Sequence, residues 1–394
     1  MKISGFNRIS GFLLLLLFIN SACSHKSQPQ TIMVPVNKDI PHYNDSHIII
    51  NRKTTYSKFP GKSDVLNTLN QYLQNPQKFS LRKLQITADV GNVISLNKDN
   101  VLLLDTRNNR LIEYNISNDK SMDVAKNGRG PGELLFSKDM VKRGDRIYLA
   151  NQMQVSRFNC NNQTCAYAGE TKLGFIPSSL TISGDSLAIL GSFSMRGINK
   201  KQLKNKLEHL KAVHVVKLSG KSVTSFGQPY AIHNQWMLIR PFVSDGLVRY
   251  LPNRKQYIVA YKRLPLIYVY NQQFKLQQTY KIADFFTGKQ KYIRKKLELF
   301  IVNGNFSRIQ HIVPVNDNNA LIIIRTLTKL SNNKNPRKYK LQYDFYDVDF
   351  KGEQSYYLGS INPEKPRSLQ NIFVTGSDIF IYKNATLFRV VTKK

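Results

Sequence analysis

The chain has 394 residues, with 58 Lys or Arg against 25 Asp or Glu and a formal net charge of +33. A chain this long exceeds an ordinary single hydrophobic core, which indicates either several domains or the repetition of a small unit. The positive charge favours anionic partners such as acidic glycans, lipopolysaccharide or phospholipid headgroups. Binding of nucleic acid is not expected, because the sequence contains no recognised nucleic-acid motif.

The amino terminus has the pattern of an export signal. Lys2 and Arg8 precede an apolar block at Phe12 to Ile19, which is too short to cross a bilayer as a helix because that takes about 20 residues. Two small residues then precede Cys23, an arrangement that resembles a bacterial lipobox. We predict that residues 1–22 are removed and that Cys23 becomes the lipidated first residue. Ordinary cleavage nearby, which would leave a soluble periplasmic protein, is the alternative.

The residues after the signal are polar and have no periodicity, so residues 23–40 are predicted to be a flexible tether. Residues 41–394 are expected to form one domain. Near its start, leucines at helical spacing predict a short helix at about residues 62–73.

A two-strand pattern then recurs along the domain. Each copy is an extended run entered from a Gly, Asn or Asp turn, followed by a second extended run, and the alternation of apolar residues predicts a β-hairpin. The six copies are Asn100 to Asn115, Gly144 to Asn159, Gly184 to Ser219, Asn253 to Asn271, Asp317 to Asp349 and Gly376 to Thr392. Such a unit cannot bury both faces alone, so neighbouring copies must stack on one another. The sequence therefore predicts an all-β fold, a six-bladed β-propeller. A blade number different by one and an open β-sandwich are the alternatives.

A propeller blade needs about four strands, so each hairpin should gain an inner entry strand and an outer strand such as Ser222 to Phe226. The last copy ends close to Lys394 and lacks one strand. We expect the early extended segment His47 to Tyr56 to supply it and to close the ring, because closure leaves no open sheet edge.

Two segments depart from the strand pattern. Residues 199–212 and 288–302 are rich in lysine and place apolar residues on one stripe, which predicts two inserted basic amphipathic helices. Such helices either lie on an anionic membrane or pack on the rim of the blades with solvated lysines.

The other two cysteines flank a four-residue loop at the tip of a predicted hairpin. Because paired strands bring such flanking residues together and an exported compartment is oxidising, we predict a disulfide between Cys160 and Cys165. Metal binding by this pair is not expected, because a tetrahedral zinc site needs two further ligands and none stand near.

Two loops supply candidate ligand-binding residues. The glycine-rich run Gly128 to Glu133 (GRGPGE) could hold an anion on its backbone N–H groups beside Arg129, or it could be a fixed corner between blades. The long connection around Trp236 carries His233 and Arg240, and long loops on a rigid scaffold are common places for ligand contacts.

The lipobox-like start, the phrase Asn109 to Asn115 and the following GRGPGE resemble the six-bladed β-propeller lipoproteins of Gram-negative bacteria, which are similar in architecture to NHL-type propellers. The resemblance is clearest from Leu84 to Asn159. It implies a six-bladed protein of the cell envelope and no particular activity, and fold alone does not settle function in this architecture.

Two functions are compatible with these features. The first is a lipid-anchored, non-catalytic binding or scaffold module for a partner protein or an envelope glycan. The second is a metal-dependent propeller enzyme of the lactonase or lyase type, which would aim His and carboxylate ligands at the ring axis. The inner-strand residues are mostly Leu, Ile, Val and Ser, as in Val93 to Leu96, which favours the first. A third possibility is an electrostatic contact between the basic surface and anionic lipid.

We therefore predict no catalytic residue, no cofactor and no metal, and a monomer anchored in the membrane by its lipid. The absence of an acidic run after Cys23 favours the periplasmic side of the outer membrane over the cell surface.

Overall fold

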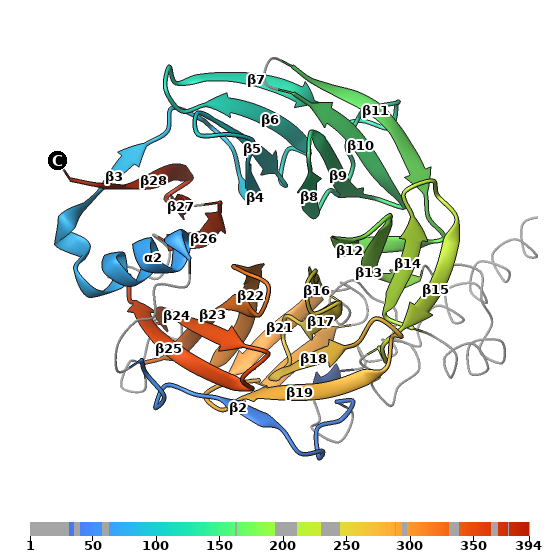
Figure 1. The fold of residues 1–394 in the computed structure, drawn as a ribbon. Helices are drawn as coiled ribbons and strands as arrows, with labels where there is room; N and C mark the ends of the chain where they lie inside the picture. The colour runs from blue at the N-terminus through green and yellow to red at the C-terminus, as the bar shows by residue number, and fades with distance from the viewer. Residues whose placement is uncertain are drawn as a thin grey trace, which may run out of the picture.

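A computed structural model of the chain describes residues 31–34, 40–56, 63–161, 164–193, 211–229, 245–287, 289–293, 298–303, 305–330, 339–363, 369–376 and 378–393. Within these residues, six sheets of four or five strands surround a central axis, and a separate sheet has three strands (Figure 1). The chain is a six-bladed β-propeller, as its repeats predict.

The innermost strand of each blade comes first along the chain, and the next strands follow outward (Figure 1). Blades 1 to 3 contain β4 (Val90–Ser95), β5 (Asn100–Asp105), β6 (Arg110–Asn115) and β7 (Lys120–Ala125); β8 (Asp139–Arg143), β9 (Arg146–Asn151), β10 (Gln154–Cys160) and β11 (Cys165–Lys172); β12 (Phe175–Ser183), β13 (Ser186–Phe193), β14 (Val213–Lys217) and β15 (Ser222–Phe226). Blades 4 to 6 contain β16 (Gly246–Leu251), β17 (Gln256–Tyr261), β18 (Leu266–Tyr270) and β19 (Leu276–Ile282); β22 (Phe306–Pro314), β23 (Asn319–Lys329), β24 (Tyr339–Asp349) and β25 (Gln354–Ile361); β26 (Leu369–Thr375), β27 (Asp378–Lys383) and β28 (Thr386–Thr392).

The six predicted hairpins are the two middle strands of the six blades, from β5 and β6 in blade 1 to β27 and β28 in blade 6. In three blades the preceding tight turn contains a glycine in the same left-handed conformation, with φ of 55° at Gly144, 58° at Gly184 and 57° at Gly376. Only glycine adopts this region without strain from a Cβ atom. The repeated turn explains why the repeats could be recognised in the sequence.

The hydrophobic core is distributed around the ring, with a cluster between each pair of neighbouring blades among the described residues. Alternate side chains of one strand contribute to clusters on opposite sides of their blade. Leu102 and Leu104 of β5 pack toward blade 2, whereas Val101 and Leu103 pack with Phe380 of blade 6. Each middle strand is thus covered on both faces, which explains its continuous apolar run.

Blade 6 is completed by a strand from the amino-terminal part of the chain. β3 (Phe79–Lys83) pairs antiparallel with β28, from Phe79 opposite Thr392 to Lys83 opposite Phe388. Closure by an amino-terminal strand is therefore confirmed, but the prediction that His47 to Tyr56 supplies it was wrong. β3 precedes β4 by only a few residues, so the chain passes directly from the last blade into the first.

The segment expected to close the ring joins blade 4 instead. β2 (Ile48–Ile50) adds a fifth, parallel strand at the outer edge of this blade, beside β19. Ile50 is completely buried in the cluster between blades 4 and 5, whereas Ile49 is 45% exposed. Burial of Ile50 thus fixes this segment two blades away from the predicted position.

The predicted helix near residues 62–73 is present as α2 (Asp64–Gln74) and is followed by a short 3-10 helix, η2 (Pro76–Lys78). α2 begins after Ser63, whose hydroxyl oxygen accepts a hydrogen bond from the backbone N–H of Leu66 and so satisfies one donor of the first turn. Leu66 and Leu69 are completely buried between blades 5 and 6. The amino-terminal arm therefore follows the outer rim across blades 4, 5 and 6 before β3 closes the ring.

The three-stranded sheet corrects two predictions. It contains β1 (Thr31–Val34), β20 (Lys289–Ile293) and β21 (Glu298–Asn303) in the order β1, β20, β21. The helix predicted at residues 288–302 was wrong, because β1 pairs with β20 and offers the apolar and aromatic residues there a strand partner. β1 also lies within the segment predicted to be a tether, so that part of it is not free chain. The helix predicted at residues 199–212 lies outside the described residues, apart from its last two positions.

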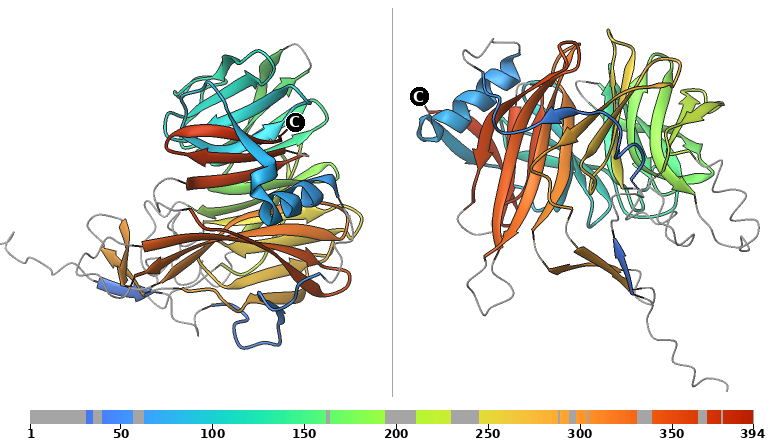
Figure 2. Two further views of the ribbon diagram at one scale, coloured as in Figure 1. Left: turned by 90° about the vertical axis from the view of Figure 1, so that its left-hand side faces the viewer. Right: turned by 90° about the horizontal axis from the view of Figure 1, so that it is seen from below.

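The ring has two axial faces. We call the face where the innermost strands begin the entry face, and the face where they end in turns such as Gly144 and Gly184 the turn face. Neighbouring strands of a blade are antiparallel, so β19 ends on the entry face, and β20 follows it there. The three-stranded sheet accordingly projects from this face, clear of the blades (Figure 2). Among the described residues, none of the helices is long and apolar enough to cross a membrane.

Candidate functional site

The centre of the ring contains a cavity of about 460 Å³. Ligand pockets for small molecules have volumes of roughly 300 to 1,000 Å³, so the cavity fits a small ligand. Innermost strands of all six blades line it, which makes it an axial site. The lining residues are Asn92, Val93, Ile94, Ser95, Met140, Val141, Lys142, Thr181, Ile182, Arg249, His311, Ile312, Val313, Pro314, Phe373, Val374 and Thr375.

A belt of polar side chains lies at the end of the cavity nearer the entry face. We call Asn92, Asp139, Ser179, Arg249, His311 and Asn371 the polar belt. Five of them occupy equivalent places, since Asn92, Asp139, Ser179, His311 and Asn371 pair with corresponding residues of the second strand. Four of these five places follow a β-bulge, an irregularity that redirects a side chain. The bulges thus direct polar side chains toward the axial channel.

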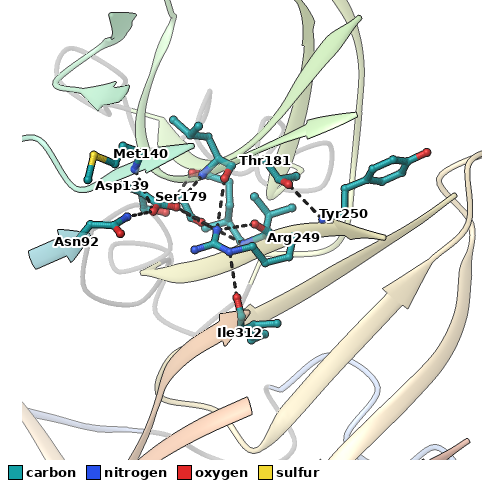
Figure 3. A network of polar contacts seen from close by, with 12 residues as sticks. Asn92, Asp139, Met140, Ser179, Thr181, Arg249, Tyr250 and Ile312 are labelled. Atoms are coloured by element: carbon teal, nitrogen blue, oxygen red, sulfur yellow. Dashed lines mark hydrogen bonds and ion pairs between the residues drawn. The ribbon is translucent and has the colours of Figure 1, made fainter. Parts of the chain in front are cut away.

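The strongest part of the belt joins Asp139 of β8 to Arg249 of β16 (Figure 3). Arg249 Nη1 lies 3.1 Å from Asp139 Oδ2, and it also donates to Ser179 Oγ at 2.9 Å. Asp139 accepts further bonds from the Asn92 amide at 2.7 Å and from the Ser179 hydroxyl at 2.7 Å. On its other side, Arg249 Nε donates to the carbonyl of Ile312 at 3.1 Å. These contacts connect blades 1 to 5.

The other half of the belt joins blades 5 and 6. Asn371 Oδ1 accepts hydrogen bonds from His311 Nε2 at 2.9 Å and from the Gln310 amide at 3.0 Å. Burial lowers the pKa of His311 to about 4; the hydrogen bond with Asn371 opposes the shift, and the charges of Lys262 and Arg249 add to it. His311 is therefore neutral at neutral pH and carries its proton on Nε2.

The cavity has a positive electrostatic character. Its ionisable lining groups are Lys142, Arg249 and His311, and the lining within the described residues contains no Asp or Glu. Lys142 Nζ donates to the backbone carbonyls of Ser95 and Leu96, which hold the ammonium group without neutralising it. Arg249 uses Nε and Nη1 in the belt, and its Nη2 group has no hydrogen bond to the described residues. Both side chains therefore keep donors for an anion.

The GRGPGE loop does not present an open anion site. Glu133 of the same loop accepts a hydrogen bond from the N–H of Gly130 at 2.6 Å. Its carboxylate therefore occupies the position that an external anion would take on the backbone N–H groups of the loop. A Cβ atom on Gly128 would lie 2.0 Å from the same carboxylate. Arg129 is exposed and is not among the residues that line the cavity. These contacts support the reading of the loop as a fixed corner between blades.

The remaining predicted site residues are two cysteines that the structure describes and four residues that lie outside the described part of the chain. Cys160 and Cys165 face each other across β10 and β11 and are joined by a disulfide. Cys23, His233, Trp236 and Arg240 lie outside the described residues. Of the predicted ligand-binding residues, only Arg129 belongs to the described part of the chain, and it does not line the axial cavity.

The belt and Lys142 were missed in the sequence because the repeats were aligned on the hairpins and not on the innermost strands. The available signal was a polar residue just before an apolar run, a few residues upstream of each turn. Asn92 precedes Val93, Asp139 precedes Met140, and Asn371 precedes Ile372 in this way. Blade 4 departs from the pattern, because Leu247 occupies the equivalent place and Arg249 reaches the belt from two residues further along.

The residues present do not form an evident metal site. Among the described residues, no group of three or more His, Cys, Asp or Glu is placed to hold a metal ion. In the belt, Asp139 is already bound by Arg249 and His311 by Asn371. This donor set does not fit the axial metal that a lactonase-type or lyase-type propeller would need.

Comparisons with known proteins agree with the fold. No protein-family model and no curated protein matches the sequence. Solved structures do match, among them a Bacteroides fragilis protein that is predicted to be exported, with 13% identity, a TM-score of 0.50 and coverage of 88% of this chain and 100% of that one. A member of the DUF4221 family from Bacteroides vulgatus has 9% identity and a TM-score of 0.51, with coverage of 80% and 97%.

A streptogramin B lyase is more distant, with 8% identity, a TM-score of 0.43 and coverage of 80% of this chain and 97% of that one. Identities this low show a shared fold and give no information about activity. The chemistry of the cavity must therefore carry the functional argument.

Proposed function

We propose that this chain is a non-catalytic binding module of the cell envelope, whose axial cavity holds an acidic group of an envelope glycan. The observation that carries the proposal is the charge of the cavity. Lys142 forms no ion pair with the described residues, and Arg249, although paired with Asp139 in the belt, has an Nη2 group without a hydrogen bond to them. A ligand with a carboxylate, sulfate or phosphate group would supply the missing countercharge.

The shape and the walls of the cavity favour a glycan over a folded partner. A volume of about 460 Å³ accepts a small ligand or the end of a chain, and it is too small for a protein domain. Apolar side chains such as Val93, Ile312 and Phe373 alternate with polar groups from Ser95 and Thr375. Such walls suit a sugar ring, which has apolar C–H faces and hydroxyl groups at its edge.

A lipid on Cys23 would place this site away from the membrane. Cys23 precedes Thr31 of β1 by eight residues, which span at most roughly 29 Å when extended. β1 lies in the sheet that projects from the entry face (Figure 2). The entry face would therefore lie toward the membrane, and the cavity would open at the turn face toward the envelope. We place the anchor in the outer membrane, on the periplasmic side, as the sequence favours.

The enzyme alternative gains no support from the described residues. A metal-dependent lactonase or lyase needs several His and carboxylate ligands directed at the axis, and the belt commits its Asp139 and His311 to other partners. We therefore retain binding without turnover as the proposed function.

Isothermal titration calorimetry tests the proposal. The ligands are short oligosaccharides that contain a uronic acid and neutral oligosaccharides of the same length. We expect the acidic ligands to bind at least about tenfold more tightly, because a hydrogen bond to a charged group contributes about 1.5 to 3 kcal/mol. This difference should shrink as salt rises.

The matched variants are Lys142→Met, which removes a cavity charge, and Lys221→Met, which removes an exposed charge in the turn between β14 and β15. Lys142→Met should weaken acidic ligands about tenfold, and Lys221→Met should change their affinity less than twofold. Equal affinity for neutral ligands, or equal effects of the two variants, would refute the cavity as the site. Cleaved or isomerised sugar detected by mass spectrometry after incubation would favour the enzyme alternative instead.

A further inference from the structure

A second group of cations lies on the other side of the polar belt, at the entry face. Lys138 precedes β8, Asp245 precedes β16, Lys262 follows β17, and Arg308 belongs to β22. Lys262 Nζ lies 2.9 Å from Asp245 Oδ1, and Arg308 Nη2 lies 2.9 Å from Asp245 Oδ2. Blades 2, 4 and 5 thus bring three cations and one carboxylate to the mouth of the axial channel.

The charges in this group do not balance. Burial acts to raise the pKa of Asp245, but the charges of Lys262, Arg308 and Lys138 outweigh it and lower the pKa to about 2. Asp245 is therefore ionised, and the three cations against one carboxylate leave a local excess of positive charge, to which the nearby Arg263 adds. The side chains of Lys262, Asp245 and Arg308 are only 18%, 19% and 28% exposed, so water screens this excess incompletely.

Lys138 is the cation without a partner of its own. Burial lowers its pKa, the charge of Asp245 opposes that shift, and the charges of Lys262 and Arg308 add to it. Lys138 forms no ion pair with the described residues, because Asp245 is already shared by the other two cations. A largely buried ammonium group held beside two further cations is unfavourable unless a ligand compensates it.

Unused donors are also present. Arg308 Nε is buried and has no hydrogen-bond partner among the described residues, and Lys138 has three N–H donors.

We propose that Lys138, Lys262 and Arg308 form a second binding site, which holds a doubly charged oxyanion of the phosphate class. The phosphate is either a free ion or the headgroup phosphate of a lipid. A lipid headgroup would be within reach, because the proposed anchor holds the entry face near the membrane. This site lies on the opposite side of the belt from the axial cavity, so it goes beyond the proposed function.

Two lysines at opposite ends of β8 belong to different sites, so their variants distinguish the two sites. Lys138 stands just before β8 on the entry side, and Lys142 near its end lines the cavity. We would titrate the full chain, purified in neutral detergent, with inorganic phosphate at constant ionic strength against a chloride control, and follow the melting temperature. Phosphate should raise the melting temperature in a saturable way. Lys138→Met should weaken the apparent phosphate affinity at least tenfold, and Lys221→Met, which removes an exposed charge between β14 and β15, should leave it within twofold.

A vesicle arm identifies the source of the phosphate. The full chain is sedimented with phosphatidylcholine vesicles that contain phosphatidic acid, or with phosphatidylcholine alone. Loss of the preference for phosphatidic acid in Lys138→Met, but not in Lys221→Met, assigns the site to a lipid headgroup. Phosphate binding without a vesicle preference that depends on Lys138 assigns it to the free ion.

Two outcomes would overturn the site. The first is the absence of any effect of phosphate beyond chloride together with the absence of a vesicle preference. The second is an equal response of the Lys138→Met and Lys221→Met variants. Lys138→Met should melt at or above the temperature of the wild type without phosphate, since it removes repulsion, and Lys138→Gln repeats the test if the methionine variant does not fold. Loss of glycan binding in Lys142→Met alone would concern only the axial cavity, so the two proposals can fail separately.

Discussion

Replacement of Arg249 by Met should break the belt that joins the blades around the channel. Arg249 contacts the Asp139 carboxylate, the Ser179 hydroxyl and the Ile312 carbonyl, which belong to three different blades. The Asp139 side chain is 6% exposed and that of Arg249 is 15% exposed. The substitution therefore leaves a negative charge in the interior without its countercharge.

The expected loss can be estimated from the contacts that remain. Removal of one partner from a buried ion pair costs about 3 to 5 kcal/mol. Asp139 would still accept hydrogen bonds from the Asn92 amide, the Ser179 hydroxyl and the backbone N–H groups of Met140 and Leu180. These four donors continue to stabilise the carboxylate, so we expect the free energy of unfolding to fall by about 3 kcal/mol, near the lower limit.

Urea denaturation, followed by far-ultraviolet circular dichroism, measures the change. A double-mutant cycle that combines Arg249→Met with Asp139→Asn should give a coupling energy of about 2 kcal/mol, because the neutral amide that replaces the carboxylate does not need the charge of Arg249. The control cycle uses Lys217→Met and Asp185→Asn. These side chains form an ion pair at 2.9 Å but are 47% and 70% exposed, so their coupling energy should stay below about 1 kcal/mol. Equal coupling energies in the two cycles would refute the structural importance of the belt.

Three further changes test the fold around the site. Burial lowers the pKa of His214 to about 4, so the unfolded chain binds a proton below pH 6.5 that the folded chain does not. The free energy of unfolding therefore falls as the pH drops from 6.5 to 4, and His214→Gln should make this fall about 3 kcal/mol smaller. Urea denaturation at the two pH values measures it, and a fall of the same size in the variant would contradict the burial of His214. In urea denaturation, Ile50→Ala should lower the free energy of unfolding by about 2 to 5 kcal/mol and Ile49→Ala by less than about 1 kcal/mol, since only Ile50 is buried. Similar losses in the two variants would contradict the position of β2. Gly246→Ala should cost about 1 to 3 kcal/mol, because its Cβ would lie 2.4 Å from a carbonyl oxygen of the paired strand. Gly174→Ala should not change the stability, because a Cβ atom there would have no other atom within 4 Å. Equal melting temperatures of the two alanine variants would contradict the register of β16 and β17.

The six hairpins were predictable because their information is local. Each one has a turn residue such as Gly144 or Gly184 and alternating apolar strands within about 20 residues, and this pattern needs no knowledge of distant partners. The basic helix predicted at 288–302 failed for the converse reason. β20, which pairs with β21 of the same segment, takes its other strand partner from β1, more than 250 positions earlier in the chain.

The closing strand was assigned to the wrong segment because apolar content was a misleading guide. β3 has the burial pattern of an edge strand, with Phe79 buried and Leu81 40% exposed, and it carries few apolar residues. Ile48 to Ile50 has the stronger strand sequence, but a short strand can pair at any free edge, and the outer edge of blade 4 takes it. Local propensity does not decide which edge is filled.

The candidate site was less accessible from the sequence than the fold. Polar belt residues such as Asn92 and Asn371 reach the axis through β-bulges, and a bulge is set by the pairing of two strands and has no reliable sequence signal. Arg249 enters the belt at a place that the other blades do not use. Lys142 and Lys138 are two among 58 basic residues, and only the geometry of the ring distinguishes them from solvated surface charges.

The most direct test of the axial site uses methyl NMR spectra of the full chain with ¹³C-labelled methionine methyl groups. Met140 lines the cavity and is 2% exposed, whereas Met122 on the outer strand β7 is 52% exposed. On addition of an acidic oligosaccharide, the Met140 signal should shift and saturate at the dissociation constant measured by calorimetry, while the Met122 signal stays in place. Saturable binding that leaves the Met140 signal unchanged, or an equal shift with the neutral sugar, would contradict an anion-binding cavity on the axis.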